Sequence, residues 1–142
     1  MAQISMIGAG NLASHLSLAL QKSGHDIVQL FSRTAKSAIP LAQVLNCPFT
    51  TNLNELEKSE LAIIAVSDDA ISEIANQISI PMVHTSGTKD IKILNNNEIC
   101  GVFYPLQTFS KKKEVDFRKI PICIEANNKK FEKLLEKIFK QS

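Results

Sequence analysis

A short glycine-containing stretch near the amino terminus constrains the fold of this chain more than any other feature. The residues Gly8, Ala9, Gly10, Asn11, Leu12 and Ala13 follow an apolar run and open a helical pattern. In this Gly-x-Gly-x-x-Ala pattern the first glycine permits a tight turn, the second leaves room for a pyrophosphate, and the alanine keeps the helix close to the strand. The first N–H groups of a helix lack internal acceptors and attract an anion. We expect Gly8 to Leu12 to hold a dinucleotide.

The residues after this pattern favour a strand–helix–strand unit. Leu12, Leu16, Ala19 and Leu20 are spaced to share one helix face. Ser23, Gly24 and His25 then form a helix stop, and residues 26–31 read as a second strand. A glycine turn that binds no ligand is the alternative interpretation. The length of the whole unit favours a nucleotide site over that alternative.

The residues after the second predicted strand bear on the choice of cofactor. A site that prefers NAD usually has Asp or Glu here, for the ribose 2′-hydroxyl. This chain has Ser32, Arg33 and Thr34 instead, with Lys36 close behind. A carboxylate would repel a 2′-phosphate, whereas hydroxyls and a planar guanidinium can hydrogen-bond to it. The sequence therefore favours NADP over NAD, the alternative being that Arg33 and Lys36 are ordinary surface cations.

A second ligand-facing segment is expected after a continuous apolar run at residues 61–66. Such a run is typical of a central parallel strand that is buried on both faces. We expect Val66, Ser67 and Asp68 to flank the cofactor, because ligands of this fold lie at the carboxyl ends of strands. Asp68 or Asp69 should cap a helix over residues 70–78, and for Asp68 this role is favoured over catalysis.

The next strand, residues 80–84, is followed by further polar residues. His84 and Ser86 lie beside Gly87, at the end of a strand where chemistry is expected. They are weak candidates for catalysis. His84 could transfer a proton or simply hydrogen-bond to loop carbonyls. Ser86 could hold the nicotinamide ribose or a substrate oxygen.

The remaining elements predict one α/β domain with a doubly wound, mainly parallel sheet over residues 1–142. Expected helices cover residues 36–46, a turn at 90–94 and a last helix with a clear apolar stripe, capped by Asn127 or Asn128. Asn52 or Asn54 is expected to cap a further short helical turn, and short strands are expected at 48–50, 101–109 and 120–125. Within them Tyr104 is expected to be structural, while Gln107 could reach the cleft.

Composition restricts the function classes. The chain has 142 residues, 44% of them hydrophobic, without a run long enough to span a membrane or a signal peptide, so a cytoplasmic protein is expected. Three cysteines without CxxC spacing are expected to be reduced and buried, and the histidines form no metal-ligand pattern. The net charge is +2, with a basic excess after residue 110 that lacks any nucleic-acid motif. A solvated surface is the favoured interpretation, and no nucleic-acid partner is expected.

Several motifs read together resemble a known family. They are residues 8–13, 32–34, 66–71, 84–87 and 104–109. The set resembles the N-terminal half of a bacterial family of uncharacterised Rossmann-like oxidoreductases, in which a helical C-terminal domain of unknown function follows. The likeness spans essentially the whole chain, and its last two motifs are the most specific. More distantly the chain is similar to pyrroline-5-carboxylate reductase and to the 6-phosphogluconate and 3-hydroxyacid dehydrogenases.

The resemblance implies an NADP-binding domain of an oxidoreductase that transfers a hydride between NADP(H) and a small substrate. Pyrroline-5-carboxylate reductases usually have Lys-Pro where this chain has Ser67 and Asp68. In these relatives the helical second domain completes the substrate site and forms the dimer. We therefore expect a chain truncated before that domain, able to bind cofactor but weak in turnover, and a homodimer of the full-length protein.

Two other functions are considered. A non-catalytic dinucleotide-sensing or scaffold domain is compatible with the sequence, because no residue is an unambiguous catalyst. A nucleoside site of the S-adenosylmethionine type is disfavoured, since such sites usually keep an acid where Ser32 lies. The apolar stripe of the last helix is expected to be exposed and to favour self-association.

Overall fold

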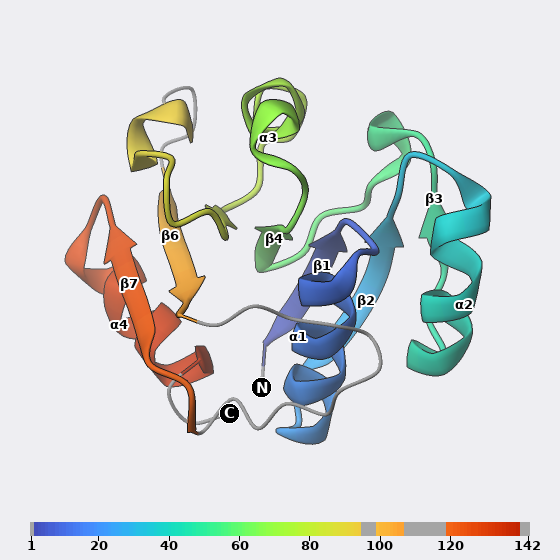
Figure 1. The fold of residues 1–142 in the computed structure, drawn as a ribbon, viewed down its shortest axis with the longest axis horizontal. Coiled ribbons are helices and arrows are strands. Elements are labelled where there is room, and N and C mark those ends of the chain that lie inside the picture. The colour runs from blue at the N-terminus through green and yellow to red at the C-terminus, as the bar shows by residue number, and fades with distance from the viewer. Residues whose placement is uncertain (1, 95–98, 107–118, 140–142) are drawn as a thin grey trace.

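The chain folds around one seven-stranded sheet. The computed structural model describes residues 2–94, 99–106 and 119–139. The strands lie in the order β3-β2-β1-β4-β5-β6-β7, and among these described strands only the pairing of β6 with β7 is antiparallel (Figure 1). They are β1 (Gln3–Ile7), β2 (Asp26–Phe31), β3 (Phe49–Thr50), β4 (Leu61–Ile64), β5 (Met82–His84), β6 (Cys100–Pro105) and β7 (Ile122–Ala126). This order confirms the predicted doubly wound, mainly parallel sheet.

The helices connect these strands. They are α1 (Asn11–Lys22), α2 (Ala35–Leu45), α3 (Asp68–Ala75) and α4 (Lys129–Phe139), with 3₁₀ turns η1 (Leu53–Glu55) and η2 (Ile91–Leu94). The apolar run of β4 is fully buried in the centre of the sheet, between β1 and β5, as its lack of alternation predicts. No helix in the described part of the chain is long and apolar enough to cross a membrane.

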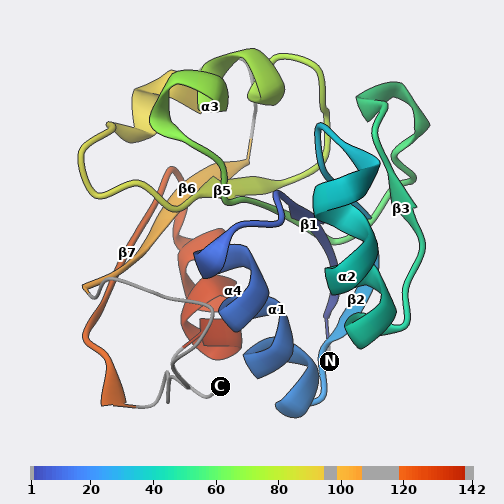
Figure 2. The same cartoon turned by 45° about the vertical axis from the view of Figure 1, so that its right-hand side comes forward.

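The two faces of the sheet are covered differently. Helices α1, α2 and α4 pack on one face, and α3 packs on the other (Figure 2). The apolar stripe of α4 lies in the first of these layers, where Phe139 stacks on Phe103 with ring centroids 3.8 Å apart. Phe131, Leu135 and Ile138 are also buried. The expectation of an exposed stripe is therefore wrong, because β6 and β7 present an apolar surface that α4 covers.

A polar network holds the connection between β3 and β4, which contains only the short turn η1. The side-chain amide of Gln29 donates to the Ser5 hydroxyl at 2.8 Å and to the Glu57 carbonyl at 2.7 Å. Its oxygen accepts from the Glu57 N–H at 3.1 Å. Because Gln29 and Ser5 are buried, these bonds offset the cost of removing polar groups from water. The network anchors the segment that carries η1 to the sheet.

The predicted helix caps have mixed outcomes. Asn52 caps η1, and the Asn128 side chain accepts from the Phe131 N–H at 2.7 Å at the start of α4. The expectation that Asp68 or Asp69 caps a helix beginning at residue 70 is wrong: α3 begins at Asp68, and Ser67 occupies the N-cap position without a side-chain hydrogen bond. The predictions for Gln107 and for the part of the basic segment at residues 111–118 lie outside the described residues.

Candidate functional site

The turn from β1 to α1 requires glycine at its first position. Gly8 has φ of +121°, a conformation that side chains rarely adopt. A Cβ at this position would overlap the carbonyl oxygen of Ala65, which follows β4. The Gly8 N–H donates to the Phe31 carbonyl at 2.8 Å, so the turn is fixed between the neighbouring strands. The predicted tight turn is confirmed.

Gly10 occupies a different environment from Gly8. It is the N-cap residue of α1, with φ of −82° and ψ of −162°, and a Cβ built there would meet no atom within 4 Å. Ala13 is fully buried, which confirms the close packing of α1 on the sheet. The backbone at Gly10 therefore faces open space at the positive end of a twelve-residue helix. This space has the form of a cradle for an anion.

The three residues after β2 differ in their surroundings. Ser32 is buried, and its N–H donates to the Thr50 carbonyl at 3.2 Å. Arg33 is exposed. The Thr34 hydroxyl caps α2, since it accepts from the Ser37 N–H at 3.2 Å and donates to the Ser37 hydroxyl at 3.0 Å. Of the predicted phosphate ligands, Arg33 keeps its donors exposed, while Thr34 uses its proton within the chain.

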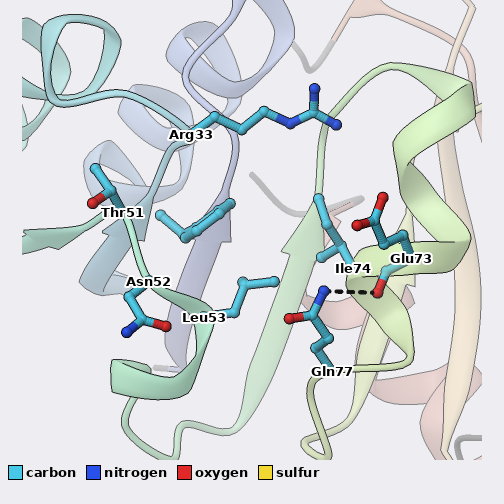
Figure 3. Close-up of a pocket in the computed structure, with 8 residues that line it drawn as sticks. Arg33, Thr51, Asn52, Leu53, Glu73, Ile74 and Gln77 are labelled. Carbon is cyan, nitrogen blue, oxygen red and sulfur yellow. Dashed lines mark hydrogen bonds between the residues drawn. The ribbon is translucent and has the colours of Figure 1, made fainter.

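A groove of about 510 Å³ opens beside Arg33. Its lining residues are Phe31, Arg33, Thr51, Asn52, Leu53, Glu73, Ile74 and Gln77 (Figure 3). The Arg33 side chain extends over the groove, with Thr51 and Asn52 on one side and α3 on the other. Three of its lining residues, Phe31, Leu53 and Ile74, are apolar and can contact a flat ring, and the others are polar.

The sequence-based search missed most of the groove lining. Thr51 and Asn52 follow directly on β3, so the rule that ligands lie at the carboxyl ends of strands could have found them. Glu73 and Gln77 come from α3 and its C-terminal end, where Gln77 donates to the Glu73 carbonyl at 3.2 Å. Nothing in the sequence distinguishes these two from other exposed polar residues of a helix.

Asp68, the first residue of α3, is bonded to the loop that follows β5. The Thr88 hydroxyl donates to a carboxylate oxygen of Asp68 at 2.8 Å. Hydrogen bonds from Thr88, and secondarily from Ser86, lower the pKa of Asp68 from its ordinary value. Val66 is half-buried and Ser67 is exposed. Asp68 is thus ionised, and it fastens the loop after β5 to the start of α3.

His84 is fully buried at the end of β5, and both of its ring nitrogens are engaged. Nδ1 accepts from the Ser86 N–H at 3.0 Å, and Nε2 lies 3.2 Å from the Asp90 carbonyl oxygen. A backbone N–H can only donate and a carbonyl can only accept, so the ring is neutral with its proton on Nε2. Burial lowers the pKa of His84 from its ordinary value. Of the two roles considered for His84, proton transfer and hydrogen bonding to its own loop, the structure shows the second.

Ser86 also belongs to the hydrogen-bonded loop. Its hydroxyl lies 3.2 Å from the Thr88 hydroxyl and accepts from the Thr88 N–H at 3.2 Å. The loop after β5, which contains Ser86, is therefore held mainly by contacts within itself, to His84 and to Asp68. Within the described ranges, no group of three or more His, Cys, Asp or Glu side chains is arranged to hold a metal ion.

The topology brings the predicted residues to one edge of the sheet. Residues 8–12, 32–34 and 66–67 follow β1, β2 and β4, and residues 84–86 start at the last residue of β5. These four strands run parallel and end at the same edge. In doubly wound sheets this edge carries the ligand crevice. The open cradle at Gly10 lies between the groove beside β2 and the loop after β5, as the order of the strands requires.

Comparisons with known proteins give the family and the fold of this chain. A family model described as "NADP oxidoreductase coenzyme F420-dependent" matches residues 3–87. A search of curated proteins gives no match. Among solved structures, a protein of Bacteroides fragilis, provisionally described as an NADP oxidoreductase, is 40% identical with a TM-score of 0.93. The alignment covers 99% of this chain and 57% of that one.

Two more distant structures show the fold alone. Prephenate dehydrogenase from A. aeolicus, solved with NAD⁺, is 15% identical with a TM-score of 0.82. The alignment covers 99% of this chain and 57% of the dehydrogenase. A pyrroline-5-carboxylate reductase from Coxiella burnetii is 16% identical with a TM-score of 0.79. The alignment covers 99% of this chain and 56% of the reductase. The chain thus spans little more than half the length of these proteins. It belongs to the family of NADP oxidoreductases described as coenzyme F420-dependent and has the Rossmann fold typical of domains that bind a nicotinamide dinucleotide.

Proposed function

We propose that this chain is the NADP-binding domain of an oxidoreductase that transfers a hydride between NADP(H) and a small substrate. The observation that carries the proposal is the pair formed by the open cradle at Gly10 and the exposed Arg33 beside the groove. A side chain at Gly10 would fill the space into which a pyrophosphate fits. No acidic residue follows β2 directly, where a site that prefers NAD usually has one.

Different residues bind the different parts of NADP. Gly8 to Leu12 hold the pyrophosphate at the start of α1. Arg33 with Ser32 and Thr34 forms the 2′-phosphate site, in which the exposed Arg33 supplies the side-chain donors. The groove beside Arg33 accepts the adenosine part, while Val66 and Ser67 flank the nicotinamide half. The cofactor supplies the hydride chemistry, and the protein positions it and excludes water.

The proposal extends to the domain organisation. Residues 1–142 act as the cofactor-binding domain, and a helical part of the full-length protein completes the substrate site and forms a homodimer. The support is that the matched structures are longer, since this chain covers 57% of the Bacteroides fragilis protein. The substrate is a small molecule with a C=N or C=O bond that accepts the hydride, or the reduced amine or alcohol that donates it.

Calorimetric titration with NADPH and with NADH tests the cofactor assignment. We expect tighter binding of NADPH, by tenfold or more. Arg33→Glu should weaken NADPH binding by roughly 10- to 100-fold, the equivalent of a lost charge-assisted hydrogen bond. NADH binding should be little changed. Lys129→Glu, which makes the same charge change on α4, is the matched control and should bind both cofactors as the unaltered chain does.

Two results would contradict the assignment. Equal affinity for NADH and NADPH would remove the 2′-phosphate site while leaving the pyrophosphate cradle. If neither NADPH nor NADH binds at millimolar concentration, this chain has no dinucleotide site.

The second candidate is a domain that binds the dinucleotide without catalysis and regulates a partner. The saturated hydrogen bonds of His84 favour it, because a neutral ring with both nitrogens engaged cannot exchange a proton without breaking the loop. Oxidation of NADPH by the protein with any small ketone or cyclic imine would rule this candidate out.

A further inference from the structure

The loop after β5, residues 85–90, is held from three directions. His84 binds it from within the sheet through its two ring nitrogens. Asp68 binds it from α3 through Thr88. The third contact comes from β6, where the ring of Tyr104 lies against Gly87. The first two contacts use hydrogen bonds, whereas the third is a packing contact.

The position of Tyr104 follows from the strand register. His84 pairs with Val102 of the parallel strand β6, so Tyr104 lies two residues further toward the carboxyl edge of the sheet. A Cβ built on Gly87 would overlap Cζ and both Cε atoms of the tyrosine ring. The hydroxyl-bearing end of the ring therefore rests on the backbone of the loop. Only glycine at position 87 permits this contact.

The protons of the loop are assigned by its hydrogen bonds. The single proton of the Thr88 hydroxyl goes to Asp68. The Ser86 hydroxyl therefore directs its own proton into the same cluster, toward Thr88, and keeps only acceptor capacity for a ligand. The Nε2 proton of His84 goes to the Asp90 carbonyl.

Tyr104 differs from these three residues. Its ring is half-buried, and no hydrogen bond joins its hydroxyl to any residue that the structure describes. Among the hydroxyl and imidazole groups that form or contact this loop, it is the one whose proton is not already committed to the described part of the chain. A neutral donor at this place is suited to an acceptor oxygen of a ligand.

We propose that the Tyr104 hydroxyl donates a hydrogen bond to the nicotinamide half of the bound cofactor. The inference rests on the proposed function. With the adenosine part in the groove beside β2 and the pyrophosphate at Gly10, the strand order places the other half of the cofactor toward β4, β5 and β6. The ribose and carboxamide oxygens of that half are the acceptors, and Tyr104 is a cofactor-contacting residue instead of a purely structural one.

The test uses two probes, NADPH and 2′-phospho-ADP-ribose, which lacks the nicotinamide. Tyr104→Phe keeps the ring on Gly87 and removes only the hydroxyl. We expect it to weaken NADPH binding roughly two- to tenfold, as for the loss of one neutral hydrogen bond, and to leave the affinity for 2′-phospho-ADP-ribose unchanged. Arg33→Glu is the matched control, because it should weaken the binding of both probes.

A second variant guards against a folding defect. Gly87→Ala changes no hydrogen-bonding side chain but forces the Tyr104 ring away from the loop, so it should reproduce the selective loss of NADPH affinity. Unchanged NADPH affinity in Tyr104→Phe, or an equal loss for both probes, overturns the inference and leaves the proposed function in place. Failure of the unaltered chain to bind either probe overturns both.

Discussion

The two ends of the crevice treat their polar groups in opposite ways. At the end near β2, Gly10 faces open space and Arg33 extends its guanidinium over a groove. At the end near β5, His84, Ser86 and Thr88 direct their protons to groups of the protein itself. One end has donors available for a ligand, and the other has used nearly all of its donors to fix a loop.

The difference indicates two tasks. Exposed donors at a helix start and on an arginine provide binding free energy for phosphates, which are charged and need several donors. A loop whose hydrogen bonds are satisfied before a ligand arrives loses little entropy on binding and holds its shape. The first end is suited to affinity, and the second to positioning.

The largest effect is expected at the turn between β1 and α1. Gly8→Ala should lower the free energy of unfolding by at least about 3 kcal/mol, because it combines a strained backbone conformation with overlap on the Ala65 carbonyl. Gly10→Ala, two residues away, should change stability by less than about 1 kcal/mol and weaken NADPH binding tenfold or more. Urea unfolding and calorimetric titration measure the two quantities.

This pair of variants tests whether the end near β2 is open in order to bind a ligand. Should Gly10→Ala destabilise the chain as much as Gly8→Ala does, the space at Gly10 would be a structural requirement and not a cradle for a ligand. Retained NADPH affinity in a stable Gly10→Ala chain would likewise remove the pyrophosphate from that space.

A pH-dependent loss of stability is expected from the end of the crevice near β5, the closed end, where the polar groups already bond to the protein. His84 has a lowered pKa in the folded chain, so the unfolded chain binds its proton first as the pH falls. Its contribution to stability is complete above about pH 6.5 and declines as the pH falls from there to the folded pKa, by at most about 1.4 kcal/mol per pH unit. Urea unfolding at pH 7.5 and 5.5 measures this slope.

His25 provides the internal comparison for this experiment. Burial lowers its pKa as well, and its Nδ1 accepts from the Ala2 N–H at 3.0 Å, so it changes stability in the same direction. His84→Gln should therefore flatten the slope in part and leave the share of His25. A slope that is unaltered in His84→Gln would show that His84 is not held neutral by its loop.

The sequence was most informative at the end of the crevice near β1 and β2, the open end, where donors face open space. The turn at Gly8, the packing of Ala13 and the run of β4 depend on backbone conformation and on local apolar pattern, and both are visible in consecutive residues. The parallel sheet follows from the alternation of these elements. NADP as the preferred cofactor remains a prediction, because it rests on Arg33 and on a missing acid.

The closed end could not be predicted in the same way. Asp68 is expected as a helix cap from its place before a helical pattern, but Thr88, twenty residues further on, takes its carboxylate as a hydrogen-bond acceptor. The contact of Tyr104 with Gly87 likewise depends on the register of β6 against β5. The stripe of α4 illustrates the same limit, since its pattern shows an apolar face but not the strands that cover it.

The smallest effect is expected from the contact that joins the two loops. Thr88→Val keeps the shape of the side chain and removes the proton donated to Asp68. The pKa of Asp68 should rise toward its ordinary value, because the hydrogen bond from Thr88 is the main cause of its lowering. Since the contact is exposed, stability at neutral pH should fall by only about 1 kcal/mol. Titration of the Asp68 carboxyl by NMR measures the pKa, and Asp69, its exposed neighbour, is the internal control. An unchanged Asp68 pKa would mean that the loops at the ends of β4 and β5 are not held together by this hydrogen bond, and the contrast between an open and a closed end would then rest on His84 alone.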